Sequence, residues 1–194
     1  MSSNRSRCRP TLEALEGRLA LSTAAPADTL AVLTAFTKAY QSHPGEANYN
    51  PALDLNHNHQ IAQSDGKLLL RSLPPLSPDV PLRLTVSLTP ADTAHYHHPT
   101  NSGGVTFART PTVIGHTTPG ALIFTGTGTL DLKLRGPAYV SDARGDFAIK
   151  VNLTDGINQF DMLVVDAHGH QLLRAYPILW LGFGRYEAAH PRKT

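Results

Sequence analysis

Oxygen-bearing side chains alternate along residues 54–65, which read DLNHNHQIAQSD. Aspartate, asparagine and asparagine hold the first, third and fifth places of this twelve-residue window, and a second aspartate closes it. Alternate residues of a tight turn point to the same side, where their oxygens can gather around a large, hard cation such as Ca²⁺. The spacing therefore predicts a calcium site. Its predicted ligands are Asp54, Asn56, Asn58, Gln60 through its backbone carbonyl, and Asp65.

The pattern resembles the calcium loop of EF-hand proteins. Ile61 at the eighth place would anchor the loop to a core, and Ala62 at the ninth can offer only a bound water. The sixth place usually holds glycine because the chain bends there with positive φ, and here it is His59, which tolerates that bend at some cost. With two charged ligands and a short Asp65 at the end, we expect a dissociation constant on the order of 10⁻⁴ to 10⁻³ M.

A second interpretation of the same loop needs no ion. Asparagine and aspartate are common in turns because their side chains bond to the nearby backbone. The two interpretations differ in one observable, because only a bound ion makes the melting temperature depend on millimolar calcium.

Helical patterns lie on both sides of the loop. Residues 28–42 can form an amphipathic helix with Asp28 available to cap its first turn. Its apolar face would carry Leu30, Leu33, Phe36 and Tyr40. After the loop, Leu69 and Leu73 stand one turn apart with Leu68 beside them, and the two prolines at 74 and 75 stop the helix.

The stretch NYNPALDLNHNHQIAQSDGKLLLRSL resembles half of a dockerin, the calcium-dependent module that binds cohesin domains in bacterial extracellular assemblies. The resemblance covers roughly residues 28–75, although a full dockerin has two calcium loops and residues 28–42 supply a helix alone. It implies a small helical module at 27–73 and a cohesin-like or other surface protein as partner. Gln63 and Ser64 stand where dockerins carry partner-recognition residues.

Residues 74–81 form a proline-rich linker, and beyond it the hydrophobic period changes from 3.6 to 2. The alternating stretches LRLTVSLT, LDLKLRG and FAIKVNL predict half-buried strands. Turn signals recur every 8 to 12 residues or so, as in an antiparallel sandwich. The sequence therefore predicts one all-β domain over residues 82–186, followed by a tail at 187–194.

Motifs in this second part resemble those of bacterial immunoglobulin-like domains of surface proteins. They are TPTVIGHTTPGALIF and SDARGDFAIKVNLTDGINQFDMLVVDAHGH. We expect positive φ at the turn glycines Gly145, Gly156 and Gly169. We interpret Asp142, Asp155 and Asp166 as residues that bond the turn backbone, with a catalytic or metal-binding role as the alternative. The predicted fold class is thus α+β in two domains, an EF-hand/dockerin-like helical module and an immunoglobulin-like β-sandwich.

Residues 1–26 have the outline of an export segment, with a basic start, leucines in the middle and small residues at the end. Within them, LEALEGRLALS resembles the L-E-x-L-E-x-R segment that opens many exported proteins of planctomycete-type bacteria. We therefore expect a secreted or cell-surface protein. The single cysteine, Cys8, lies in this segment, so it predicts no intramolecular disulfide.

Charge and hydropathy narrow the class of partner. Lys and Arg number 17 against 15 Asp and Glu, and the first 18 residues hold four basic and two acidic side chains, so the rest has 13 of each sign. This neutral balance gives no footprint for nucleic acid. No run approaches the roughly 18 apolar residues of a membrane span, so none is expected.

Other chemistry-bearing residues give weaker signals. His95, His97 and His98 in HYHH suggest a transition-metal site, but no cysteine or spaced acidic residue completes a set nearby, which favours a solvated loop. The sequence has four glutamates, none between Glu46 and Glu187, and no G-x-S-x-G, P-loop or H-E-x-x-H motif, so we expect no enzyme. Carbohydrate binding by stacking is an alternative function. Its candidate aromatic residues are Tyr139, Tyr176, Trp180 and Phe183.

Overall fold

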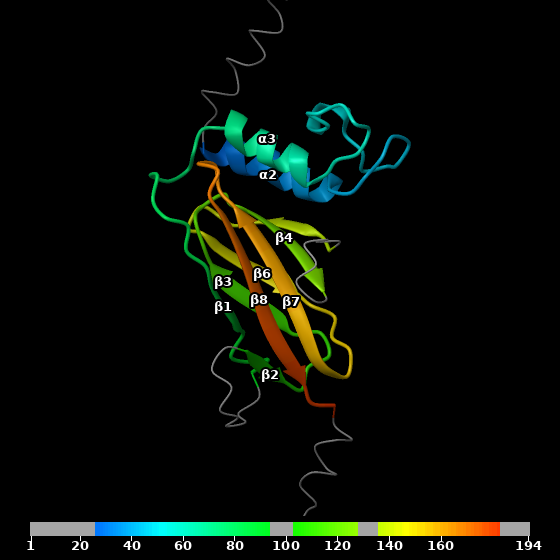
Figure 1. Cartoon of the computed structure of the whole chain (residues 1–194), viewed down its shortest axis with the longest axis vertical. Helices are drawn as coiled ribbons and strands as arrows, with labels where there is room; N and C mark the ends of the chain where they lie inside the picture. Colours follow the sequence, from blue (N-terminus) through cyan, green and yellow to red (C-terminus); the bar gives the residue numbers. More distant parts are fainter. Residues whose placement is uncertain (1–25, 94–102, 128–135, 183–194) are drawn as a thin grey trace, which may run out of the picture.

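The computed structural model describes residues 26–93, 103–127 and 136–182, and this part of the chain is an α+β fold (Figure 1). It contains two α-helices and eight strands in two sheets. Several sequence predictions lie outside the described residues. These are the export segment, the three histidines of HYHH, the strand at LDLKLRG apart from its last residue, Phe183 and the C-terminal tail.

Both predicted helices are present. Helix α2 spans Pro26–Ala39, and Gln41 beyond it has a φ of 69° that takes the chain out of the helix. A 3-10 turn, η1, covers Pro51–Leu53, and helix α3 spans Gln63–Ser72. The apolar face of α3 differs from the prediction in one place, because Leu70 is buried beside Leu69 whereas Leu68 is 40% exposed.

The strands form a three-stranded and a five-stranded sheet. The smaller sheet has the order β1 (Thr85–Leu88), β3 (Thr112–His116) and β6 (Asp146–Lys150). The larger has the order β2 (Gly104–Thr106), β8 (Gln171–Trp180), β7 (Gly156–Val165), β4 (Leu122–Thr127) and β5 (Ala138–Val140). Pairing is antiparallel throughout except that β2 runs parallel to β8.

The two sheets pack face to face around one hydrophobic cluster. In β6 the exposed and buried residues alternate as predicted, with Phe147 and Ile149 facing inward. The turn glycines also behave as predicted, because Gly145, Gly156 and Gly169 have φ values of 89°, 94° and 88°. The other residues that fill the space between the sheets include Leu88, Val113, Ile123, Phe160, Met162, Val164, Tyr176 and Ile178.

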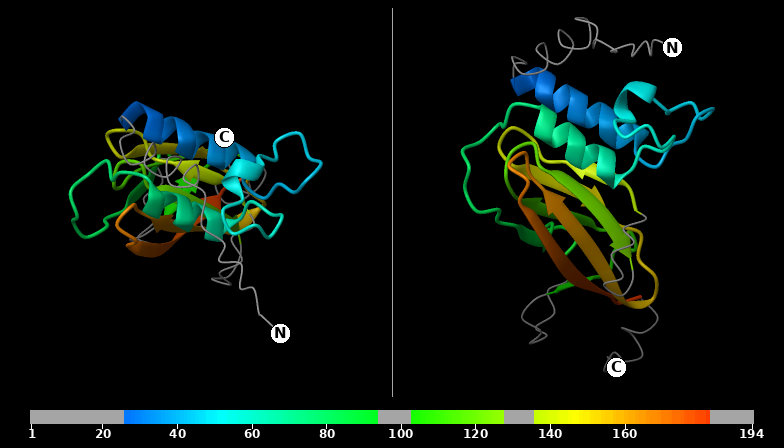
Figure 2. Two further views of the ribbon diagram at one scale, coloured as in Figure 1. Left: turned by 90° about the horizontal axis from the view of Figure 1, so that it is seen from above. Right: turned by 45° about the horizontal axis from the view of Figure 1, so that its top comes forward.

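A second cluster joins the helices to the other face of the five-stranded sheet, across one end of it (Figure 2). Strand β7 shows why its sequence does not alternate. Met162 and Val164 face the smaller sheet, while Leu163 and Val165 face the helices, so both faces are apolar. The division into domains at 27–73 and 82–186 remains a prediction, and the two parts share this core.

The helix–sheet contact is closest at Gly66 of α3. A Cβ atom at this position would lie 2.8 Å from Phe36 Cζ and 3.0 Å from Leu122 Cδ1 and from Phe124 Cζ. The Phe36 and Phe124 rings meet edge to face with their centroids 6.5 Å apart. The glycine therefore lets α3 lie directly on aromatic side chains of α2 and β4, and the loop that leads into α3 is fixed by this packing.

Candidate calcium site

The loop at residues 54–65 is attached to α2 through Ile61. The Gln41 N–H donates to the Ile61 carbonyl (2.7 Å), and the Ile61 N–H donates to the Ser42 carbonyl (3.0 Å). The Ile61 side chain is fully buried in the helix–sheet core. The prediction that the eighth place anchors the loop is therefore confirmed, and its anchor is the chain just after α2.

Asp54 begins the loop with a carboxylate that is turned inward. Its side chain is 2% exposed. Oδ1 accepts from the Asn58 N–H (3.1 Å), and Oδ2 accepts from the His59 N–H (2.9 Å) and the Tyr49 hydroxyl (3.0 Å). Burial raises the pKa of the Asp54 carboxyl, but these hydrogen bonds favour the charged form and hold the pKa below its ordinary value.

Asp65 ends the loop and lies in the first turn of α3, which begins at Gln63. Its side chain is completely buried. Oδ1 accepts from the Asn56 N–H (3.1 Å) and Oδ2 from the Ala62 N–H (3.0 Å), so the carboxylate binds two loop amides and caps the helix. The Asn56 side-chain amide also lies 3.5 Å from Asp65 Oδ2, which connects the third and twelfth places.

The remaining predicted ligands lie between these two carboxylates. Asn56 Oδ1 accepts from the Asn58 N–H and Asn58 Oδ1 accepts from the Gln60 N–H, both at 3.0 Å. Asn56 and Asn58 are exposed and Gln60 is half-buried. The structure thus brings the four predicted side-chain ligands into one hydrogen-bonded network, while Gln60 joins it through its N–H.

The Tyr49 hydroxyl is affected by both carboxylates of the loop. Burial is the largest cause that raises the pKa of Tyr49, followed by the hydrogen bond to Asp54 and by the negative charges of Asp54 and Asp65. Both carboxylates therefore act on the same phenol. The sequence contained this residue in the NYNP stretch before the loop, but no rule of spacing assigned it a place beside Asp54.

Two histidines of the loop adopt the left-handed conformation. His59 at the sixth place has a φ of 64°, the bend for which calcium loops usually use glycine. His57 at the fourth place has a φ of 57°, which the sequence analysis did not anticipate. Because asparagine, aspartate and histidine accept positive φ more readily than other side chains, the loop keeps this bend without a glycine.

The charges of the loop are the observation that favours a cation. Two buried carboxylates lie in one short loop, and neither forms an ion pair with a Lys, Arg or His side chain in the described part of the chain. Buried charges are costly unless they are paired or bind a metal. The available donors are all oxygens, and this set suits Ca²⁺ rather than a softer metal. The described residues contain no group of three or more His, Cys, Asp and Glu side chains placed to hold a metal ion.

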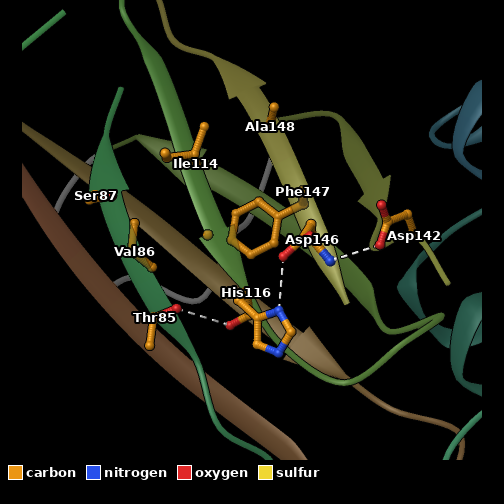
Figure 3. Close-up of a pocket in the computed structure, with 10 residues that line it drawn as sticks. Thr85, Val86, Ser87, Ile114, His116, Asp142, Asp146, Phe147 and Ala148 are labelled. Carbon is orange, nitrogen blue, oxygen red and sulfur yellow. Dashed lines mark hydrogen bonds and ion pairs between the residues drawn. The ribbon is translucent and has the colours of Figure 1, made fainter. Parts of the chain in front are cut away.

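A second candidate is an open groove of about 690 Å³ on the three-stranded sheet (Figure 3). Its ionisable lining residues are His116, Asp142 and Asp146. His116 Nδ1 lies 2.9 Å from Asp146 Oδ1, and both side chains are about 60% exposed. Asp142 is occupied by its turn, where Oδ1 accepts from the N–H groups of Arg144 and Asp146. The groove therefore offers a solvated contact between a histidine and an aspartate, and a turn aspartate, which is a weaker basis for a specific site.

The turn role predicted for the aspartates is confirmed at two positions. Besides Asp142, Asp166 Oδ1 accepts from the N–H groups of His168 (3.0 Å) and His170 (2.9 Å). The backbone hydrogen bonds from Asp146 and then Arg144 hold the pKa of Asp142 below its ordinary value. Both carboxylates thus stabilise turns between strands as acceptors of backbone N–H groups.

The aromatic residues considered for carbohydrate binding pack into the protein. Tyr176 is buried, and Tyr139 and Trp180 are half-buried against the cluster between the sheets. The Trp180 ring N–H donates to the Phe107 carbonyl (3.2 Å), and Arg109 lies over the ring at 5.9 Å from its centroid. These three residues do not form a common exposed face.

Comparison with protein-family models and with curated proteins finds no match to this chain. The likeness to dockerins and to immunoglobulin-like domains therefore rests on the motifs alone. In the described residues, neither helix has the length and apolar composition that a bilayer crossing requires.

Proposed function

We propose that the chain is an exported, non-enzymatic calcium-binding protein that acts as a docking, adhesion or spacer module at the cell surface or in an extracellular assembly. The helices and their loop would be the EF-hand/dockerin-like part, and the two packed sheets the immunoglobulin-like part. The observation that carries the proposal is the pair of buried carboxylates, Asp54 and Asp65, which lie in one loop and form no ion pair with another side chain among the described residues.

Calcium would be held by the two carboxylates, the Asn56 and Asn58 side chains and the Gln60 carbonyl. When bound, it supplies two positive charges that neutralise the carboxylates. Four loop N–H groups and the Tyr49 hydroxyl donate to the two carboxylates and already fix their positions. Because Asp65 also caps α3 and Ile61 pairs with the end of α2, an ion here would strengthen the contact between the helices.

The extracellular location belongs to the same proposal. It is supported by the export-like N-terminal segment and by the weak affinity expected of a loop with two charged ligands. A docking role is supported by the dockerin-like motif, with a cohesin-like or other surface protein as the partner. For polysaccharide binding, the alternative, the packed positions of Tyr176 and Trp180 give no support.

Calorimetric titration with calcium tests the proposal directly. We expect the full chain to bind one Ca²⁺ with a dissociation constant on the order of 10⁻⁴ to 10⁻³ M, and Asp65→Asn to weaken binding about tenfold or more, because it removes one of two ligand charges.

Asp28→Asn is the matched control. Both aspartates lie in the first turn of a helix, Asp28 in α2 and Asp65 in α3, but Asp28 is exposed. This variant should bind like the wild type. No binding by the wild type at 10 mM calcium, or equal binding by Asp65→Asn, would refute the proposal.

A further inference from the structure

The linker between α3 and β1 is fastened to the turn between β7 and β8 by two histidines. His168 Nε2 lies 3.0 Å from the Ser77 carbonyl oxygen. Asp79 Oδ1 of the same linker lies 3.6 Å from His170 Nε2 and 4.0 Å from His168 Nδ1. The two imidazole rings lie side by side, with their centroids 6.1 Å apart. One linker carboxylate therefore faces a nitrogen of each ring.

The partners behind the rings determine which nitrogens carry protons. A carbonyl oxygen can only accept, so His168 Nε2 must be the donor to Ser77. His170 Nδ1 lies 2.9 Å from Oδ2 of the buried Asp166 carboxylate and is likewise a donor. In a neutral imidazole the other nitrogen is then an acceptor. When both rings are neutral, two lone pairs face the Asp79 carboxylate, and this contact becomes favourable when a ring gains a proton.

Protons fit this arrangement better than a metal ion does. Two ligands of a tetrahedral zinc lie about 3.3 to 3.4 Å apart, given bonds of about 2.0 to 2.1 Å. The separations here are 3.6 and 4.0 Å. The described residues also contain no group of three or more His, Cys, Asp and Glu side chains placed to hold a metal. A charged imidazole needs no such convergence to attract a carboxylate.

We propose that His168 and His170 form a proton-dependent latch that holds Asp79 and Val80 of the linker on the β7–β8 turn below neutral pH and releases them at alkaline pH, while the hydrogen bond to Ser77 is kept. The latch joins the linker that follows α3 to the turn that follows the C-terminal end of β7. It therefore gives the linker two states, one held on the sheet and one free to move away from it.

The groups around the two histidines determine whether the latch is closed at low or at high pH. The hydrogen bond to Asp166 is the largest cause that raises the pKa of His170, followed by the charge of Asp166, while burial opposes them and Asp79 adds to the rise. From α3, Lys67 contributes a positive charge near the turn, where its Nζ donates to Gln171 Oε1 (3.1 Å). Because the pKa of His170 is raised in the folded protein, the stabilisation of the held linker by charged His170 is fully present below pH 6.5. It is lost as the pH rises through the higher pKa that His170 has in the folded protein.

Backbone ¹⁵N relaxation of the full chain measures the latch at the linker itself. Spectra are recorded at pH 5.5 and pH 8.5, both above the range in which aspartates ordinarily titrate. We expect the order parameters of the Asp79 and Val80 amides to fall from near the rigid value of about 0.85 toward about 0.6 as the pH is raised. Asp79→Asn should give the low value at both pH values and should lower the pKa of His170 followed by its ring signals.

His43→Gln is the control, because it removes another exposed histidine that pairs with a carboxylate, Glu46, away from the linker. It should preserve the pH dependence. Equal order parameters at the two pH values in the wild type, or an unchanged pH dependence in Asp79→Asn, would overturn the proposal. A pH dependence that disappears with a zinc-selective chelator would overturn it too, because a metal would then be the link.

Discussion

Replacing Phe36 by alanine is expected to lower the free energy of unfolding by about 3–5 kcal/mol, the usual cost of removing a fully buried phenylalanine. The Phe36 ring is completely buried between α2, α3 and β4, where it meets the Phe124 ring edge to face and lies beneath Gly66. For a chain of this size the change corresponds to a drop in melting temperature of about 6–20 °C. Urea unfolding followed by circular dichroism and by Trp180 fluorescence measures it.

Leu68→Ala is the control for this prediction, because Leu68 lies on α3 but is 40% exposed. It should change stability by no more than about 0.5–1 kcal/mol. If the helices share a core with the sheet, Phe36→Ala shifts the fluorescence and circular-dichroism transitions together. A shift in the helical signal alone, with an unchanged Trp180 transition, would show that the helices fold independently of the sheet.

Replacing Asp65 by alanine is expected to destabilise the protein by about 2–6 kcal/mol even without calcium. The buried carboxylate accepts from the N–H groups of Asn56 and Ala62, and alanine leaves both donors without this partner at about 1–3 kcal/mol each. The effect is measured by urea unfolding in the presence of a calcium chelator.

The matched control is Asp28→Ala, which removes an exposed acidic residue from the first turn of α2. Only a helix-dipole contribution of about 0.3–1 kcal/mol is expected there. Equal losses for the two variants would contradict the account, because Asp65 would then be one more first-turn carboxylate rather than the residue that holds the loop closed.

The loop was the most predictable part of the molecule from its sequence. The period-2 spacing of Asp54, Asn56 and Asn58 predicted inward-facing oxygens, and the structure joins them to Asp65. The reason is local: each side chain bonds to an amide two to five residues away, and the closing bonds between Asn56 and Asp65 span nine residues. The contribution of Tyr49 could not be predicted, because its hydroxyl reaches Asp54 only after the η1 turn folds the chain back.

The sheets show the same division between local and distant causes. Alternation in β1 and β6 predicted half-buried strands, since one face of each is covered. Strand β7 was different, because the run at 162–165 is buried on both faces and carries no period. The same helical cover explains why Leu70 replaces Leu68 in the core, since the partner of α3 is a sheet that only tertiary packing supplies.

The shared core connects the proposed calcium site to the stability of the whole chain. Asp65 caps α3, Gly66 of α3 touches Phe124 of β4, and β4 pairs with β7. An ion that binds only the folded loop should therefore stabilise the sheet as well. For the expected affinity, 10 mM calcium contributes about 1.4–2.7 kcal/mol.

Thermal unfolding followed by Trp180 fluorescence, with 10 mM calcium and with a chelator, is the most direct test. The chain has one tryptophan, and it lies at the end of β8 away from the helices (Figure 1). We predict that calcium raises the wild-type midpoint by about 3–10 °C and raises that of Asp65→Asn by about half as much or less. An identical wild-type midpoint with calcium and with chelator would contradict calcium binding by the loop.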